Sequence, residues 1–174
     1  MNGRLGRGAR GYTLVELLVV MVVLGILLGL VSLSAVPDPA AKLRRDAERL
    51  ETLFALAAEE AQLSSAPIAW RGDDRGYAFF RRERDRWVAI DGDAQFRARS
   101  WDLMPVRLSL AASDVSRWAP KRGAGFDGVD DGSTAIAFPR DGLQPAFTLS
   151  IEADGRTVVL KSDGVGRYWV ESGA

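Results

Sequence analysis

The sequence predicts an α+β fold, in which a long N-terminal helix packs on an antiparallel β domain of two sheets. Three observations predict it. Residues 17–36 carry no charge, the following segment repeats apolar residues at steps of three and four, and from residue 66 short alternating runs are separated by turn residues. We therefore divide the chain into a leader at 1–11, an apolar helix at 12–36, an amphipathic helix at 37–65 and a β domain at 66–174.

The composition of the 174 residues narrows the chemistry that is available to this protein. The 23 basic and 23 acidic side chains balance, and the sequence contains neither histidine nor cysteine. A disulfide framework, a thiolate or imidazole metal site, and Ser-His-Asp or Cys-His catalysis are therefore excluded. The acidic pairs at 59–60, 73–74 and 130–131 are sequence neighbours rather than opposed carboxylates. We predict that the protein is not an enzyme and uses no cofactor or metal.

The N-terminal segments have the charge pattern of a membrane anchor. Arg4, Arg7 and Arg10 lie in the leader, which has no acidic residue, and 20 uncharged residues follow from 17 to 36. A helix of that length is about 30 Å long, the thickness of a bilayer's hydrocarbon core. Because basic residues favour the cytoplasmic side, we expect one transmembrane helix with a cytoplasmic N-terminus. A secretory signal cleaved near residues 34–36 is the alternative, but its apolar region is normally shorter.

Glu16 lies at the start of the apolar segment and is its one charged residue. A carboxylate at the centre of a bilayer costs about 2.5 to 3.5 kcal/mol, and less nearer the interface. Glu16 is therefore a candidate functional residue that needs a cationic partner.

The residues around Glu16 resemble a known processing motif. Gly11-Tyr12-Thr13-Leu14-Val15-Glu16, after a short basic leader and before an apolar helix, is similar to the motif of type IV prepilins and type II secretion pseudopilins. The resemblance implies a pilin-like fold and a prepilin peptidase that cuts between Gly11 and Tyr12 and methylates the new N-terminus. Tyr12 replaces the usual Phe of that family. The resemblance also implies that the Glu16 carboxylate attracts the N-terminal ammonium of a neighbouring subunit and so guides subunit assembly.

The amphipathic helix is predicted to follow a break at Pro37-Asp38-Pro39, because proline lacks an amide donor and clashes with the preceding turn. Its apolar stripe consists of Leu43, Ala47, Leu50, Phe54, Ala57 and Ala61. Ser64, Ser65 and Pro67 are expected to end the helix.

The β domain is predicted to contain eight short strands in two packed sheets, with the helix stacked against one of them. The expected strands are 68–71, 77–81, 87–90, 106–110, 135–138, 147–152, 157–161 and 168–171. Residues 82–85, 153–156 and 163–166 have the turn residues that close hairpins.

The C-terminal part resembles one subgroup. Residues 136–142, IAFPRDG, followed by a strand, a glycine turn, another strand and Gly166-Arg167, are similar to the H-type minor pseudopilin of type II secretion. The resemblance implies a structural subunit of a periplasmic pseudopilus that joins a tip complex of I, J and K types to a shaft of the G type. It also implies a single-pass protein of the bacterial inner membrane, with a periplasmic domain and an assembly platform in that membrane as a partner.

A minor type IV pilin of the competence kind, which binds DNA, is the alternative. Such binding needs a basic surface. Residues 66–174 contain 16 basic and 16 acidic side chains, and the one dense basic run, at 81–86, is interrupted by Glu83 and Asp85. We therefore favour secretion over nucleic-acid binding.

Residues 113–133 form the longest stretch without signals for a helix or strand, and their length exceeds that of ordinary loops. Trp118, Lys121 and Arg122 could form a partner-contact tip, because aromatic and arginine side chains are enriched at interface centres. The aspartates at 127, 130 and 131 do not match the EF-hand spacing, so a solvated acidic loop is favoured over a calcium site.

Overall fold

The structure is a computed structural model that describes residues 13–33, 38–112 and 133–173. The chain divides into two compact units, Met1–Pro37 and Asp38–Ala174, which are described one at a time.

The first unit contains the helix α1 (Leu14–Leu33). Thr13 precedes it and caps it, because its hydroxyl oxygen accepts a hydrogen bond from the Glu16 N–H at 3.2 Å. Side chains of α1 are described as far as Leu27, and all of them are exposed. Within the described residues, no helix combines the length and the hydropathy that crossing a membrane requires.

The second unit begins with the helix α2 (Pro39–Leu63). The Asp38 side chain accepts a hydrogen bond from the Ala40 N–H at 3.0 Å, and Pro39 occupies the first turn, where its missing donor is not needed. Pro39 therefore starts this helix. At the other end Ser64 is the C-cap and Ser65 adopts a φ of 53°, so the helix ends where the serines predicted it.

All eight predicted strands are confirmed, and every pairing is antiparallel. A ninth strand, β4, has two residues and is too short to produce an alternating pattern. One sheet has the order β3-β2-β1-β6, with β4 also paired to β2, and the other has the order β5-β7-β8-β9. The strands are β1 (Ile68–Gly72), β2 (Gly76–Glu83), β3 (Arg86–Ala89), β4 (Arg99–Ser100), β5 (Arg107–Ala112), β6 (Thr134–Phe138), β7 (Phe147–Ala153), β8 (Arg156–Ser162) and β9 (Tyr168–Ser172).

The three predicted hairpin turns are present. Arg84 and Asp85 join β2 to β3, with a φ of 54° at Arg84. Asp154 and Gly155, between β7 and β8, have φ values of 50° and 67°, as in the type I′ turn that suits the twist of a hairpin. Gly164, between β8 and β9, has a φ of 81°, and a Cβ there would lie 2.5 Å from the Gln144 carbonyl oxygen. A side chain at 164 would therefore disrupt this turn.

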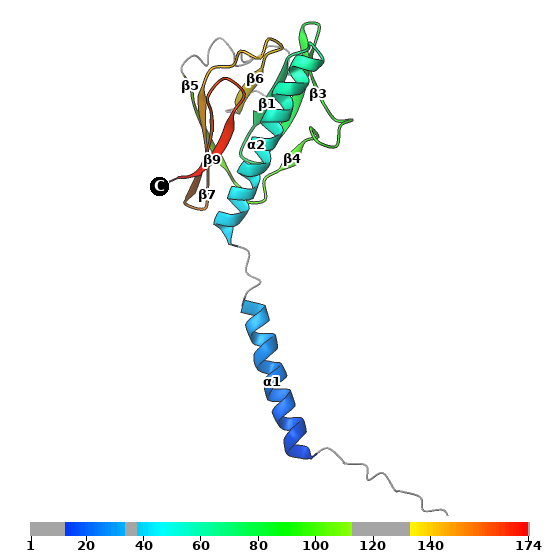
Figure 1. Cartoon of the computed structure of the whole chain (residues 1–174), viewed down its shortest axis with the longest axis vertical. Coiled ribbons are helices and arrows are strands. Elements are labelled where there is room, and N and C mark those ends of the chain that lie inside the picture. The colour runs from blue at the N-terminus through cyan, green and yellow to red at the C-terminus, as the bar shows by residue number, and fades with distance from the viewer. Residues whose placement is uncertain (1–12, 34–37, 113–132, 174) are drawn as a thin grey trace, which may run out of the picture. The chain divides into compact units, whose positions relative to one another are not determined.

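The helix α2 packs against both sheets, which corrects the prediction that it stacks against one. Figure 1 shows α2 running along the β domain between β9 and β1. The Phe54 ring lies 5.4 Å from Trp70 in one sheet and 6.1 Å from Phe147 in the other, measured between centroids. The physical reason is that Phe54 is large, whereas Ala57 and Ala61 beside it are small enough to let two sheets approach one helix. All six residues of the predicted stripe are buried, together with Leu53.

Candidate functional site

The predicted cleavage site falls at the edge of the described chain. Gly11 and Tyr12 lie outside the described residues, and Glu16 occupies the first turn of α1. The Glu16 carboxylate is exposed, and it forms no hydrogen bond or ion pair with any residue that the structure describes. A negative charge is favoured at this end of a helix, where the unpaired backbone N–H groups carry partial positive charge. Glu16 is therefore well placed in its own helix and still available to a cation from outside.

Thr13 contributes a function that our sequence interpretation missed. Its hydroxyl caps α1 through the Glu16 N–H, three residues further on. The pattern Thr-x-x-Glu before an apolar run is the sequence signal of a capping box, and it was present in the motif. Thr13 thus holds the backbone of Glu16 in the first helical turn.

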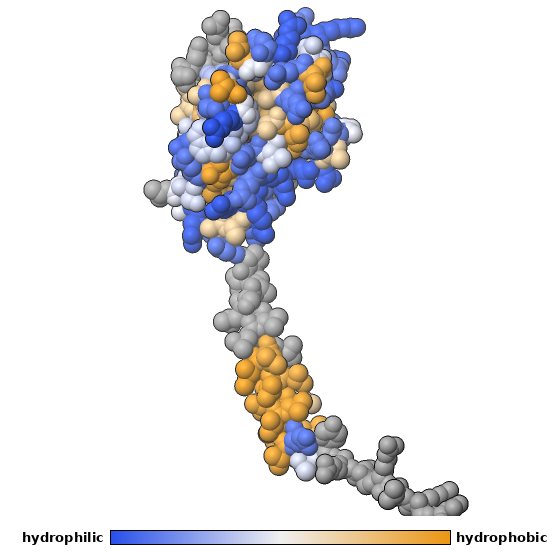
Figure 2. Space-filling view, viewed as in Figure 1, coloured by the Kyte–Doolittle hydropathy of each residue, from blue (hydrophilic) through white to orange (hydrophobic). Residues whose placement is uncertain are grey.

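The described apolar side chains of α1 are accessible on all sides of the helix. Its large hydrophobic residues from Leu14 to Leu27 are at least 48% exposed. Figure 2 shows α1 as almost entirely hydrophobic, whereas the surface of the second unit is mostly hydrophilic. A helix that is apolar all round requires an apolar environment, either lipid or other helices.

The predicted partner-contact loop cannot be placed, because Trp118, Lys121 and Arg122 lie outside the described residues. The aspartates at 127, 130 and 131 lie outside them too. Within the described residues there is no group of three or more acidic side chains that could hold a metal ion. The described chain resumes at Ser133, whose hydroxyl accepts a hydrogen bond from the Arg71 Nε.

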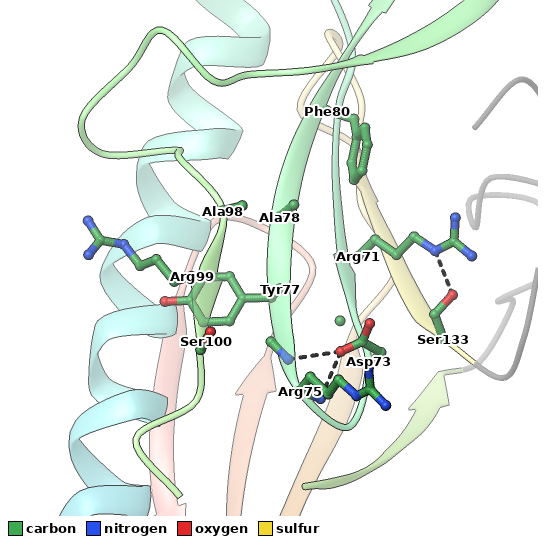
Figure 3. A pocket seen from close by; sticks show the side chains of 12 residues that line it. Arg71, Asp73, Arg75, Tyr77, Ala78, Phe80, Ala98, Arg99, Ser100 and Ser133 are labelled. Carbon is green, nitrogen blue, oxygen red and sulfur yellow. Dashed lines mark hydrogen bonds between the residues drawn. The ribbon is translucent and has the colours of Figure 1, made fainter. Parts of the chain in front are cut away.

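A cleft of about 360 Å³ lies at the turn between β1 and β2, and Figure 3 shows its lining. Asp73 is its acidic residue, and one carboxylate oxygen accepts hydrogen bonds from the backbone N–H groups of Arg75 and Gly76, both at 2.8 Å. Arg71 and Arg99 point in opposite directions in this view. The Asp73 carboxylate therefore fixes the turn, and the described side chains that line the cleft do not form a pair of a nucleophile and a base.

The arginine run at 81–86 does not form one basic patch. Arg81 and Arg82 are neighbours on β2, so their side chains project to opposite faces of the sheet. Arg81 forms an ion pair with Glu60 of α2 at 2.9 Å, and the Arg82 guanidinium lies 5.5 Å from the centre of the Trp87 ring. Two arginines of the run thus lie on opposite faces of the sheet, which disfavours the continuous basic surface that the DNA-binding alternative needs.

Asp46 is a buried acid that our sequence interpretation missed. It is 1% exposed on the inner face of α2, and its Oδ2 accepts a hydrogen bond from the Asp102 N–H at 2.8 Å. Arg49 lies 3.5 Å from the other carboxylate oxygen. Burial raises the pKa of Asp46, although the Asp102 hydrogen bond and the Arg49 charge lower it. The signal was the position of Asp46 between Leu43 and Ala47 on the apolar stripe, which predicts an inward side chain.

Two family profiles match the chain. The prokaryotic N-terminal methylation motif matches residues 6–32, which include Glu16 and the predicted cleavage site. The type II transport protein GspH family matches residues 46–164, which is more than half of the chain.

Individual relatives agree with these profiles. The type II secretion system protein H of Pseudomonas aeruginosa is 34% identical over 168 residues, which cover 91% of this chain and 93% of that protein. The crystal structure of the minor pseudopilin EpsH from the type II secretion system of Vibrio cholerae is 17% identical and superposes with a TM-score of 0.59 over 79% of this chain and 98% of that one. The solution structure of Escherichia coli GspH is 20% identical, with a TM-score of 0.52 over 79% of this chain and 94% of that one. At such identities the two structures show a common fold.

Proposed function

This chain belongs to the GspH family and is a minor pseudopilin of type II secretion, and we propose that it enters a periplasmic pseudopilus after its leader is removed between Gly11 and Tyr12. One observation carries this proposal. The methylation motif overlaps the capped first turn of α1, where the Glu16 carboxylate is exposed and forms no ion pair with a described residue.

Cleavage would create the cation that Glu16 needs. Hydrolysis of the bond after Gly11 releases an α-amino group on Tyr12, and a single methyl group leaves that amine able to carry a positive charge. An ammonium and a carboxylate are each costly in lipid, but the cost falls when the two are paired. Pairing of the Tyr12 ammonium of one subunit with Glu16 of its neighbour would therefore set the axial register of the two subunits.

As a pseudopilin with a prepilin motif, the chain is membrane-anchored, and its partners include other pseudopilins and the peptidase. The finer topology is part of our proposal. Residues 12–36 cross the bacterial inner membrane once, the leader with Arg4, Arg7 and Arg10 stays in the cytoplasm, and residues 37–174 lie in the periplasm. The apolar surface of α1 and the basic leader support this orientation.

The place of the subunit in the filament is also a proposal. By its H-type character the chain would lie between a tip complex of I, J and K types and a shaft of the G type, after delivery by the inner-membrane assembly platform. The similarity to the type II secretion system protein H of Pseudomonas aeruginosa, over 91% of this chain, supports the H-type character on which this proposal rests.

Mass spectrometry of the N-terminus tests the processing step. We expect the mature chain to begin at Tyr12 and to carry one added methyl group. A Gly11→Leu variant should keep the leader, whereas Gly8→Leu, three residues upstream, should be processed normally. An intact N-terminus in the wild-type chain, or a cut near Ala35, would contradict the proposal.

A Glu16→Ala variant tests the assembly role. We expect normal membrane insertion and processing, because the substitution makes the segment more apolar. The amount of the variant in sheared pseudopili should fall by about tenfold or more, because the ammonium of the neighbouring subunit would remain unpaired. Glu16→Asp, which retains the charge on a shorter side chain, should recover part of the incorporation. Normal incorporation of Glu16→Ala would exclude the charge-pairing role.

A further inference from the structure

The sheet of β1, β2, β3 and β6 has an outer face that carries a row of apolar side chains. Successive residues of a strand project to opposite faces, so Ala69 points outward because its neighbour Trp70 lies in the core. Residues directly opposite each other in an antiparallel pair share a face. Ala69 lies opposite Phe80 of β2 and Ala137 of β6, and Phe80 lies opposite Ala89 of β3. One large ring therefore lies among small side chains across all four strands.

Two residues of this outer face are buried. Ala69 is 0% exposed, and Trp87 of β3, which lies opposite Arg82, is 7% exposed. The main hydrophobic core, as the described residues form it, includes neither side chain. The Arg82 guanidinium, 5.5 Å from the centre of the Trp87 ring, covers one side of that ring. Since an outer sheet face with nothing packed on it is open to water, the burial of Ala69 and Trp87 indicates that part of the chain lies over this face.

The connection between β5 and β6 returns to this face. The described chain stops at Ala112 and resumes at Ser133, and twenty residues lie between them. Because β5 and β6 contact each other, this length exceeds what the connection needs. Ser133 lines the cleft of about 360 Å³ together with Arg71 and Phe80, and its hydroxyl accepts a hydrogen bond from the Arg71 Nε. Figure 3 shows these three side chains on the same side of the sheet.

The outer face is basic as well as apolar. The outward positions of its four strands carry two charged side chains, Arg71 and Arg82. The nearest acidic groups belong to the turns. Asp73 accepts hydrogen bonds from two backbone N–H groups of its own turn, and Asp85 lies 4.0 Å from Arg82. A segment that packs on this face therefore needs apolar side chains and negative charge.

The end of the connection has that composition. Residues 126–132 contain Phe126, Val129, three aspartates and no basic residue. Seven extended residues reach about 23 Å, whereas the strands from β6 to β3 span about 14 Å. The first half of the connection has the opposite charge, because residues 113–122 contain three basic residues and one acidic residue. Only the second half thus complements the outer face in both charge and hydropathy.

We propose that residues 126–132 pack on the outer face of the β1, β2, β3 and β6 sheet, with Phe126 against Phe80 and Ala69 and the aspartates toward Arg71 and Arg82. The outer face is then an interaction surface for a segment of the same chain. Burial of the two rings supplies the attraction, and the charges select the acidic half of the connection over the basic half.

The two halves of the connection then have different roles. The arginines that attract the aspartates repel Arg117, Lys121 and Arg122. The basic half therefore stays off the sheet, and the partner contact predicted for Trp118, Lys121 and Arg122 belongs to that half. The packing does not depend on the proposed function, because every observation behind it lies within the β domain.

Thiol labelling of the full chain in detergent tests the packing. The natural chain has no cysteine, so a single introduced cysteine reports without background. Ala69→Cys would be labelled in the natural chain and in a chain whose residues 114–132 are replaced by Gly and Ser at the same length. We expect labelling to be about tenfold faster after the replacement, because the cover of the outer face is lost. Ala137→Cys, opposite Ala69, is a second reporter if Ala69→Cys does not fold.

Two neighbouring positions on α2 are matched controls. Ala57 is 0% exposed like Ala69 but lies in the core, and Ala55 is exposed. Ala57→Cys should stay protected in both chains, which shows that the domain remains folded. Ala55→Cys should be labelled rapidly in both.

Neutralising the charge tests the orientation. Replacing the aspartates at 127, 130 and 131 with Asn should accelerate the labelling of Ala69→Cys by about threefold or more, and high salt should have a similar effect, because exposed ion pairs are screened. Phe126→Ser should accelerate it as well. Asp114→Asn, at the other end of the connection, is the control and should have no effect.

Rapid labelling of Ala69→Cys in the natural chain, or protection that persists after the Gly and Ser replacement, would overturn the proposal. Protection that grows with protein concentration would overturn it too, because a second copy would then cover the face. Insensitivity to the aspartates, to Phe126 and to salt would show that residues 126–132 are not the covering segment.

Discussion

Asp46 shows how one residue links the helix to the β domain. Its carboxylate is buried and accepts the backbone N–H of Asp102, which lies shortly before β5. The other carboxylate oxygen has no hydrogen bond, and the Arg49 guanidinium lies 3.5 Å from it. A buried carboxylate with incomplete partners is costly when it is ionised, and this is why its pKa is raised.

We predict that Asp46→Asn changes the pH dependence of stability. Because the pKa of Asp46 is raised in the folded state, the folded protein holds this proton more tightly than the unfolded chain. The resulting stabilisation is complete below about pH 4 and is lost as the pH rises through the raised value. Asparagine can still accept a hydrogen bond from the Asp102 N–H, and it does not ionise. The free energy of unfolding of the variant minus that of the wild type should therefore increase from pH 3 to pH 7.

Urea denaturation of both chains at several pH values measures this difference. The value at pH 3 is an internal control, because both side chains are then neutral. A relative stability that is constant with pH, or one that decreases towards pH 7, would show that Asp46 does not carry the cost of burial.

At the scale of the elements, α2 organises the second unit. Phe54 is fully buried and contacts aromatic rings from both sheets, including Phe138 at 5.2 Å and Tyr168 at 6.1 Å. The opposite face of α2 is charged, and Arg45 and Glu59 are exposed on it. The helix thus joins the two sheets on one side and exposes charged side chains on the other.

The strands of the two sheets differ in how well the sequence predicted them. β7 and β8 alternate regularly between buried and less buried residues, so a period of two is clear. β4 has only Arg99 and Ser100, and it is recognised by its pairing with Gly76 and Tyr77 of β2. A strand this short has no pattern of its own, because its existence depends on the neighbour.

At the scale of the whole molecule, the two units have separate roles. Among the side chains that the structure describes, the hydrophobic core begins at Leu43 and includes none from Met1–Pro37. The first unit carries the processing motif and the apolar helix, whereas the second carries the folded domain. Folding and membrane anchoring are therefore assigned to different parts of the chain.

This separation predicts that residues 38–174 fold without the first unit. We expect the isolated fragment to unfold cooperatively in urea, with the same midpoint as the second unit of the full chain in detergent. Leu50→Ala, which removes a fully buried side chain, should destabilise both by the same amount, about 2 to 5 kcal/mol. A fragment that does not unfold cooperatively would show that residues 1–37 contribute to the core.

The sequence by itself determined the order and type of the main elements, the processing motif and the resemblance to the H-type pseudopilins. These features are local, since a helical stripe, a hairpin turn or a motif such as residues 11–16 is complete within a few residues of chain. Only the tertiary structure decided that α2 contacts both sheets, that Asp46 is buried beside residue 102, and that Arg81 pairs with Glu60. Each of these depends on which distant segments pack together, and the balance of burial, charge and size across such contacts is not contained in any local pattern.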